Sequence, residues 1–330
     1  MISFSFFNNK GGVGKTTLVY HLTWMFRELG HRVVAVDLDP QSNLSSMFLS
    51  EDRLEEIWDP EEPGSTLFRA IQPLLRGTGD IGEPHLEFVE ERLGLLVGDL
   101  ALSEFEDSLA ESWSKCLAGD ERSFRIMSAF GRLAKQAARA FEADIVILDV
   151  GPNLGAINRA ALIASDFIVV PLGPDLFSLQ GLRNLGPRLR DWRGGWDQRR
   201  QLLPKSADVD LPKGRMEPLG YIVMRYSIRL DRPVRAYERW LSRIPGEYRG
   251  SVLGADTATA AATDQHRLAQ LKDYRSLMPM AQEANKPIFL LKPADGAIGG
   301  HQQAVLDCYQ DFRRLAQIIL DRAAHAAADT

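Results

Sequence analysis

Short apolar runs alternate with longer amphipathic segments along most of the chain. Several runs are rich in aliphatic and β-branched residues and have the length of a buried strand. They are Ile2–Phe7, Arg32–Asp37, Leu93–Gly98, Asp144–Asp149, Phe167–Pro171 and Gly220–Met224. Helical spacing predicts helices over Leu18–Phe26, Thr66–Leu75, Ser103–Trp113, Ser123–Phe141, Gly155–Ala164, Ser178–Trp192, Pro233–Arg243 and Gln303–Ala324. Strands that alternate with helices predict an α/β fold, with a mostly parallel, twisted β-sheet and helices on both faces.

The segments between these elements fit a single domain over residues 1–330. Residues 50–91 are mixed and rich in Glu, Gly and Pro, which indicates an inserted or variable region. Residues 192–214 contain a glycine pair, two prolines and dense mixed charge, which predicts a surface loop that does not divide the fold. Residues 323–330 are expected to form a frayed tail. Ser103 and Glu106 have the spacing of a capping box at the start of a helix.

A glycine-rich segment joins the first predicted strand to the first predicted helix. It reads Asn9-Lys10-Gly11-Gly12-Val13-Gly14-Lys15-Thr16-Thr17. Glycines allow a tight turn in which backbone N–H groups and the positive end of the helix dipole face an anion. In this pattern Lys15 is expected to reach the β- and γ-phosphates, and Thr16 offers its hydroxyl to Mg²⁺. We therefore expect ATP and Mg²⁺ as cofactors.

Two predicted strands end in carboxylates that can organise a metal ion and water. Asp149 stands where α/β nucleotide-binding folds place the Mg²⁺ carboxylate, although it could instead cap a helix or be a solvated acid. Asp37 and Asp39 are two residues apart in an extended segment and face the same side. One can contact the metal region while the other orients the attacking water. Either could also be an ordinary turn acid before Pro40.

Composition sets limits on the class of protein. Of the 330 residues, 45% are hydrophobic and 25% are charged, which is ordinary for a globular protein. No apolar run approaches the roughly 18 residues of a membrane span, and no basic-then-apolar leader precedes the first strand. Cys116 and Cys308 are far apart and in no metal-binding spacing, so both are expected to be buried thiols. These features favour a cytoplasmic protein.

The net charge of −5 conceals a basic region between Arg183 and Arg249, with sixteen Lys/Arg and eight Asp/Glu. Six arginines recur there at spacings of three or four: Arg225, Arg229, Arg232, Arg235, Arg239 and Arg243. On a helix, the last four would share roughly one face, which could contact DNA phosphates and would be sensitive to salt. The alternative is a solvated face whose arginines pair with Asp231, Glu238 and Glu247.

Several motifs resemble those of the ParA/MinD superfamily of deviant Walker A ATPases, and most closely the ParA/Soj-like partition ATPases. Lys10 to Thr17 resembles the deviant Walker A motif of these P-loop NTPases. Residues 37–43 are similar to their switch I, and residues 149–155 to their Walker B and switch II. Residues 166–171, 177–182 and 278–289 also fit in order, and the last resembles the segment that closes the nucleotide pocket.

The resemblance implies a role for each matched residue. Lys10 is implied to reach across a homodimer to the nucleotide of the partner subunit, and Asp39 to support hydrolysis. The implied catalytic residues are Lys10, Lys15 and Asp39, and the implied metal-site residues are Thr16, Asp39 and Asp149. The implied nucleotide-binding residues are Lys10, Gly11, Gly12, Val13, Gly14, Lys15, Thr16, Thr17 and Pro279.

The implied function is that of an ATPase switch that dimerises on ATP binding and binds DNA without sequence specificity. A ParB-like or other partner protein would stimulate Mg²⁺-dependent hydrolysis to ADP and phosphate. The cycle would partition or position a plasmid, a chromosome or a protein complex in a cytoplasmic, nucleoid-associated setting. Many plasmid-borne members carry an N-terminal helix-turn-helix, and a chain that starts at the first strand is not expected to repress an operator in that way.

The sequence departs from the family pattern in two places. Gly151 stands where the family usually has the first of two prolines, which could loosen switch II. The separation of Asp39 from Asp149 is longer than in compact members, and the extra length is expected between Ser50 and Glu91.

Two alternatives stay open. The first is a MinD-like positioning ATPase on a membrane, but the tip of the last helix lacks bulky or basic residues and membrane anchoring is not expected. The second is a metabolic P-loop enzyme that acts on a small molecule. An iron–sulfur ATPase is excluded because no cysteines flank Asp149.

Overall fold

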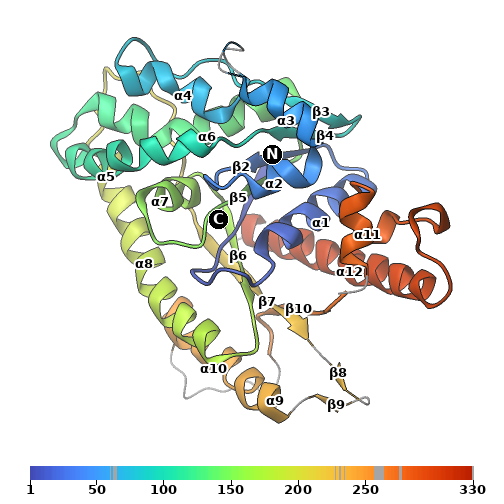
Figure 1. The fold of residues 1–330 in the computed structure, drawn as a ribbon. Helices are drawn as coiled ribbons and strands as arrows, with labels where there is room; N and C mark the ends of the chain where they lie inside the picture. Colours follow the sequence, from blue (N-terminus) through green and yellow to red (C-terminus); the bar gives the residue numbers. More distant parts are fainter. Residues whose placement is uncertain are drawn as a thin grey trace.

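An eight-stranded β-sheet forms the centre of the computed structural model (Figure 1). The structure describes residues 1–59, 61, 65–226, 228–229, 232–233, 235–255, 264–274 and 277–328, and the side chains of residues 225–237 lie outside the description. The strand order is β10-β7-β6-β1-β5-β2-β4-β3. These strands are β1 (Ile2–Phe6), β2 (Val33–Asp37), β3 (Glu87–Glu90), β4 (Leu93–Leu96), β5 (Ile145–Asp149), β6 (Phe167–Leu172), β7 (Glu217–Tyr226) and β10 (Arg267–Lys272). A separate short hairpin joins β8 (Ile228–Arg229) to β9 (Arg232–Pro233).

Neighbouring strands of the large sheet run parallel, except β3, which is antiparallel to β4. The mostly parallel α/β fold that the sequence predicts is therefore confirmed. The pattern missed β3 and β10, which lie at the two edges of the sheet. Both have alternating or irregular burial, because an edge strand has fewer neighbours than a central one.

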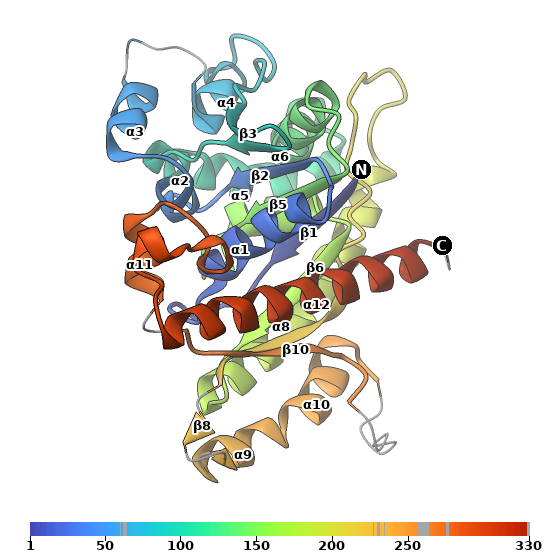
Figure 2. The ribbon, with the colours of Figure 1, turned by 90° about the vertical axis from the view of Figure 1, so that its right-hand side faces the viewer.

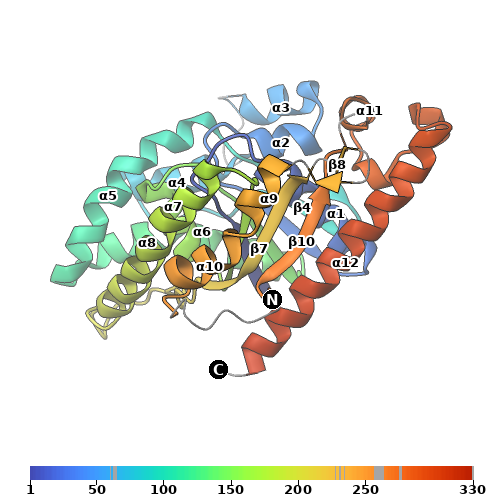
Figure 3. The same ribbon diagram turned by 90° about the horizontal axis from the view of Figure 1, so that it is seen from below.

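The helices lie on both faces of the sheet. They are α1 (Lys15–Glu28), α2 (Asn43–Phe48), α3 (Glu51–Trp58), α4 (Leu67–Arg76), α5 (Phe105–Lys115), α6 (Glu121–Ala140), α7 (Ala156–Ile163), α8 (Leu176–Arg200), α9 (Arg235–Leu241), α10 (Ile244–Glu247), α11 (Met278–Glu283) and α12 (Gly300–Ala328). Helices α4 to α8 contribute to one core, and α1, α2, α3, α11 and α12 to the other (Figure 3). On β2, Val34 and Val36 enter the first core while Val33 and Ala35 enter the second. Cores on both faces explain why the central strands are continuous apolar runs.

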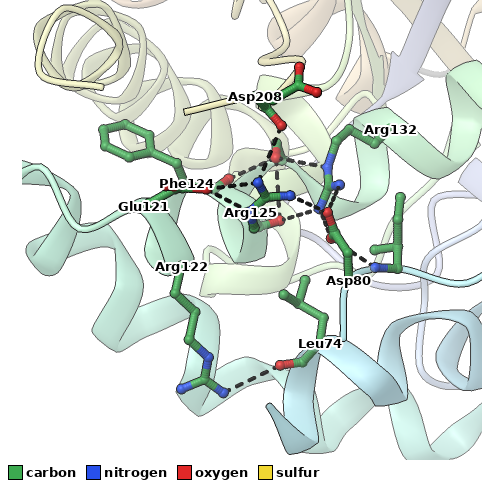
Figure 4. Close-up of polar contacts among 10 residues, drawn as sticks. Leu74, Asp80, Glu121, Arg122, Phe124, Arg125, Arg132 and Asp208 are labelled. Atoms are coloured by element: carbon green, nitrogen blue, oxygen red, sulfur yellow. Dashed lines mark hydrogen bonds and ion pairs between the residues drawn. The ribbon is translucent and has the colours of Figure 1, made fainter. Parts of the chain in front are cut away.

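The described residues of the region 50–91 pack against the rest of the fold. Ser50 and Thr66 cap α3 and α4, since their side chains accept from the N–H groups of Arg53 and Arg69. After α4, the Asp80 carboxylate accepts two hydrogen bonds from Arg132 of α6, at 2.8 and 2.7 Å, and is also bonded to Arg125 (Figure 4). This bidentate contact fixes the turn over residues 77–82, which follows α4, to the surface of α6.

The surface loop predicted over residues 192–214 is wrong in its first part, because α8 continues to Arg200. The Trp196 side chain is fully buried and stacks on Trp113, with ring centroids 6.4 Å apart. A Cβ at Gly195 would lie 2.9 Å from the Trp113 ring, so this glycine leaves room for the indole. One glycine of the pair that suggested a loop, Gly195, is therefore a packing feature of a helix.

The tail predicted over residues 323–330 is also wrong where the structure describes it. Helix α12 continues to Ala328, and Ala323 is fully buried in the second core. Alanine has the highest helix propensity, so an Ala-rich end extends a helix that packing already holds. Figure 2 shows α12 as one uninterrupted helix across this side of the molecule.

Candidate nucleotide-binding site

The glycine-rich loop connects β1 at the centre of the sheet to α1. Gly12 and Gly14 have φ angles of 73° and 88°, in the left-handed region that favours glycine, and Gly14 is the N-cap of α1. Asn8 anchors the loop, because its Nδ2 donates to the carbonyl of Pro171 at 2.6 Å and its Oδ1 accepts from the Lys10 N–H at 3.0 Å. Asn8 has no place in the glycine pattern, so the sequence did not predict this role.

Lys15 and Asp149 meet at the buried floor of the loop. The Lys15 Nζ donates to Asp149 Oδ1 at 2.5 Å, and the Asp149 side chain is fully buried. The β1–β5 pairing explains the contact, since it places Asp149 beside Phe6, just before the loop. Asp149 Oδ2 is also buried and has no hydrogen-bond partner among the described residues. A carboxylate oxygen without a hydrogen-bond partner is an oxygen donor of the kind that Mg²⁺ prefers.

The Asp37 carboxylate is hydrogen-bonded to another residue of the protein, Ser45. Its Oδ2 accepts from the backbone N–H and the hydroxyl of Ser45, both at 2.8 Å. Asp37 is paired in register with Asp149 on the adjacent strand. Burial, and then the nearby Asp149 charge, raise the pKa of Asp37 to about 7. A side chain with these bonds is engaged in fixing the segment after β2.

The Asp39 side chain lies beside the residues that follow Asp149. Its Oδ1 accepts from the Gln41 N–H at 3.1 Å, and the residue is 5% exposed. A Cβ built on Gly151 would lie 3.5 Å from Asp39 Oδ1, in van der Waals contact. The structure thus brings Asp39 and Gly151 together, from the two segments that resemble switch I and switch II.

The Lys10 side chain forms an ion pair within its own subunit. Its Nζ lies 2.5 Å from Asp175 Oδ2 and 5.7 Å from the centroid of the Phe177 ring. Asp175 also caps α8, because its Oδ1 accepts from the Ser178 N–H at 2.9 Å. Asp175 was missed at the level of sequence, because a contact across 165 positions leaves no local signal.

A pocket of about 730 Å³ lies beside the loop. Its lining includes Lys10, Gly12, Gly14, Thr17 and Asp175 from the loop and the start of the α8 region. The apolar members of the lining include Met224, Leu271, Tyr274, Met278, Pro279 and Phe312. The volume is in the range of small-molecule sites, and the mixed lining suits a ligand with both a phosphate group and an apolar ring. Pro279, which the resemblance implies contacts the nucleotide, lines the wall of this pocket.

His21 joins α1 to the segment that covers the pocket. Its Nε2 accepts from the Ile288 N–H at 3.1 Å, so Nδ1 carries the proton and donates to the carbonyl of Thr17 at 2.7 Å. The ring stacks on Phe312, with centroids 5.0 Å apart. Burial lowers the pKa of His21 to about 4, so the imidazole is neutral near neutral pH.

Of the six arginines proposed to face DNA, the structure describes the side chains of Arg239 and Arg243. Both are exposed and flank Trp240, with guanidinium carbons 5.1 and 5.4 Å from the ring centroid. Arg243 lies beyond the end of α9, which is shorter than the predicted helix 233–243. Glu247, suggested as a partner for this face, forms an ion pair with Arg183 at 2.7 Å. The side chains of Arg225, Arg229, Arg232 and Arg235, and Asp231, lie outside the described residues.

Two properties of the described residues bear on the alternatives. None of the described helices has both the length and the apolar character needed to cross a bilayer. Among those residues, no cluster of three or more His, Cys, Asp or Glu side chains has the arrangement of a metal site. Cys116 and Cys308 are buried free thiols, as the sequence predicts.

Comparisons with known proteins agree with this geometry. Residues 1–195 match the family model described as an AAA domain. The chain is 31% identical to the chromosome-partitioning ATPase Soj of Thermus thermophilus over 196 residues, which are 59% of this chain and 64% of Soj. Several other curated relatives are matched over half of their length or less.

Solved structures share the fold over most of the chain. Protein DIP2308 of Corynebacterium diphtheriae has a TM-score of 0.70 and 29% identity, and the match covers 86% of this chain and 97% of DIP2308. The ATP complex of a Cyanothece McdA variant has a TM-score of 0.65 at 14% identity, and the match covers 97% of this chain and 96% of McdA. The second likeness is one of fold alone.

Proposed function

Because the chain belongs to the ParA/MinD superfamily of P-loop ATPases, we propose that it is an ATP-driven switch that dimerises, binds DNA non-specifically and positions a cargo. A ParB-like or other partner protein would stimulate hydrolysis and release the dimer. Relatives that partition chromosomes support the cargo class, although the chain matches only part of their length.

The observation that carries the proposal is the buried Lys15–Asp149 ion pair below a glycine-rich loop. The second Asp149 carboxylate oxygen has no hydrogen-bond partner among the described residues. Bound Mg²⁺ would neutralise charge on the β- and γ-phosphates as it develops during phosphoryl transfer. The loop N–H groups would orient the phosphates, and Lys15 would exchange Asp149 for a phosphate oxygen. Asp39 would hold the attacking water, since Asp37 is already bonded to Ser45.

Two substitutions test the ATPase assignment. Lys15→Ala should lose ATP binding, because it removes the cation at the loop and leaves Asp149 as an unpaired buried charge. Asp39→Ala should bind ATP normally but hydrolyse it at least roughly a hundredfold more slowly, the scale of a lost positioning group. Titration of a fluorescent ATP analogue and phosphate release measure the two effects.

Lys115→Ala is the matched control, because Lys115 is an exposed lysine paired with Glu111 on the surface of α5. It should behave as wild type in both assays. Tight ATP binding by the Lys15 variant, or wild-type turnover by the Asp39 variant, would contradict the assignment. Hydrolysis that requires a small metabolite and is indifferent to DNA would favour a metabolic enzyme.

A further inference from the structure

Glu106 makes an unexpected contact at the start of α7. The capping box predicted from Ser103 and Glu106 is wrong, because the Ser103 hydroxyl donates to the carbonyl of Leu100 instead. The Glu106 side chain leaves its own helix. Its Oε1 accepts from the Ala156 N–H at 2.5 Å, and its Oε2 accepts from the Ile157 N–H at 2.8 Å.

Ala156 and Ile157 are the first two residues of α7, where backbone N–H groups have no partner within the helix. A carboxylate there satisfies two donors at once and lies at the positive end of the helix dipole. Helix α7 has no cap from its own side chains, since its N-cap is Gly155. Glu106 of α5 therefore supplies the cap from a distant part of the chain.

Gly155 makes this contact possible. A Cβ on Gly155 would lie 2.6 Å from Glu106 Oε1, so any side chain there would collide with the carboxylate. The same junction contains Arg159, whose guanidinium lies over the Trp113 ring at 4.5 Å and donates to the carbonyl of Leu109. Helices α5 and α7 are thus joined by several specific contacts.

The short segment between Asp149 and α7 is held by hydrogen bonds from Asn158. The Asn158 Nδ2 donates to the carbonyls of Gly151 and Asn153, at 2.9 and 2.6 Å. In space, the Gly151 backbone lies beside the Asp39 carboxylate. The segment therefore has one end fixed at Asp149 in the sheet and the other fixed in the first turn of α7.

We infer that Glu106 is a positioning residue for hydrolysis, which fixes the first turn of α7 and thereby holds Gly151 against Asp39. The inference rests on the proposed ATPase function. Without the carboxylate, two N–H groups lose their acceptor and the segment gains freedom at one end. The phosphate loop is not touched, so turnover should fall while ATP binding is kept.

Hydrogen exchange and kinetics test the inference in the full-length protein. In nucleotide-free Glu106→Ala, the amides of Ala156 and Ile157 should each exchange about tenfold faster, because each loses one charge-assisted hydrogen bond. The kcat for ATP should fall about fivefold or more, while KM changes less than about twofold. Glu106→Gln keeps one acceptor and should be intermediate. Glu111→Gln, which removes an exposed charge from the same helix, should match wild type.

Gly155→Ala provides an independent variant, because the added Cβ displaces the carboxylate without removing it. It should reproduce the faster exchange and the lower kcat. Unchanged exchange in Glu106→Ala, or faster exchange with unchanged kcat, would overturn the positioning role. A wild-type protein without ATPase activity would instead contradict the proposed function, while the exchange measurement still tests the anchor itself.

Discussion

At the scale of single residues, His21 shows how a polar side chain can be fixed inside an apolar core. Its two ring nitrogens contact Thr17 on its own helix and Ile288 near the end of the chain. The contact with Ile288 needs the neutral ring, because Nε2 must accept a hydrogen bond there, whereas Nδ1 can donate to Thr17 in either protonation state. The sequence places His21 in a helix but gives no sign of Ile288, which is 267 positions away.

Stability should therefore depend on pH through His21. Its pKa is lowered from 6.5 to about 4, so above pH 6.5 folded and unfolded chains bind no proton there and its contribution is intact. As the pH falls from 6.5 to 4, only the unfolded chain gains the proton, and the free energy of unfolding falls by roughly 3 kcal/mol.

Urea unfolding between pH 4 and pH 8 measures this loss. His21→Gln should show a shallower decline over the same range, because glutamine does not titrate. His85→Gln is the control, since His85 is exposed and paired with Glu87. An equal decline in wild type and His21→Gln would contradict the prediction.

At the scale of elements, the strands were predictable because a strand buried on both faces leaves a continuous apolar run. The helix ends were less predictable, because tertiary contacts decide them. Helix α8 is an example, since Trp196 and Gly195 extend it through a sequence with loop composition. In the same helix, a Cβ on Gly186 would lie 1.9 Å from the carbonyl oxygen of Ser251. Gly186 is therefore the point where α8 touches another backbone.

Gly186→Ala should destabilise the protein by about 3 kcal/mol or more, because the overlap is with backbone that cannot rotate away. Gly194→Ala is the matched control, since the same helix has open space at that position. It should be neutral or stabilise by up to about 1 kcal/mol through higher helix propensity. Thermal unfolding of both variants checks the pair, and similar melting temperatures would contradict the predicted close contact.

At the scale of the whole molecule, parallel strands explain why part of the site was predictable. Strands that run in one direction bring their carboxyl ends to one edge, so Lys15, Asp39 and Asp149 could be expected at that edge from the sequence. Asp175 and Glu106 could not, because each acts through a partner from a distant part of the chain. The surface that would meet DNA also depends on the assembled molecule.

If DNA binds across α9, the double substitution Arg239→Glu with Arg243→Glu should weaken ATP-dependent binding. The slope of the log binding constant against log salt concentration should become less steep by about two. Arg313→Glu with Arg314→Glu is the control, because it changes the charge equally on an exposed part of α12. Fluorescence anisotropy with duplexes of two unrelated sequences measures both. Equal losses in the two double variants, or no ATP-dependent binding by wild type, would contradict this surface.

The position of β1 in the middle of the sheet has a consequence for synthesis on the ribosome. β1 is made before its neighbours β5 and β6, whose paired residues begin at Ile145 and Phe167. At about 5–20 residues per second, β1 waits on the order of ten to thirty seconds for both partners. Lys15 can meet Asp149 only after that delay. The nucleotide site is therefore assembled only after β5 has been made, although its loop is translated long before that strand.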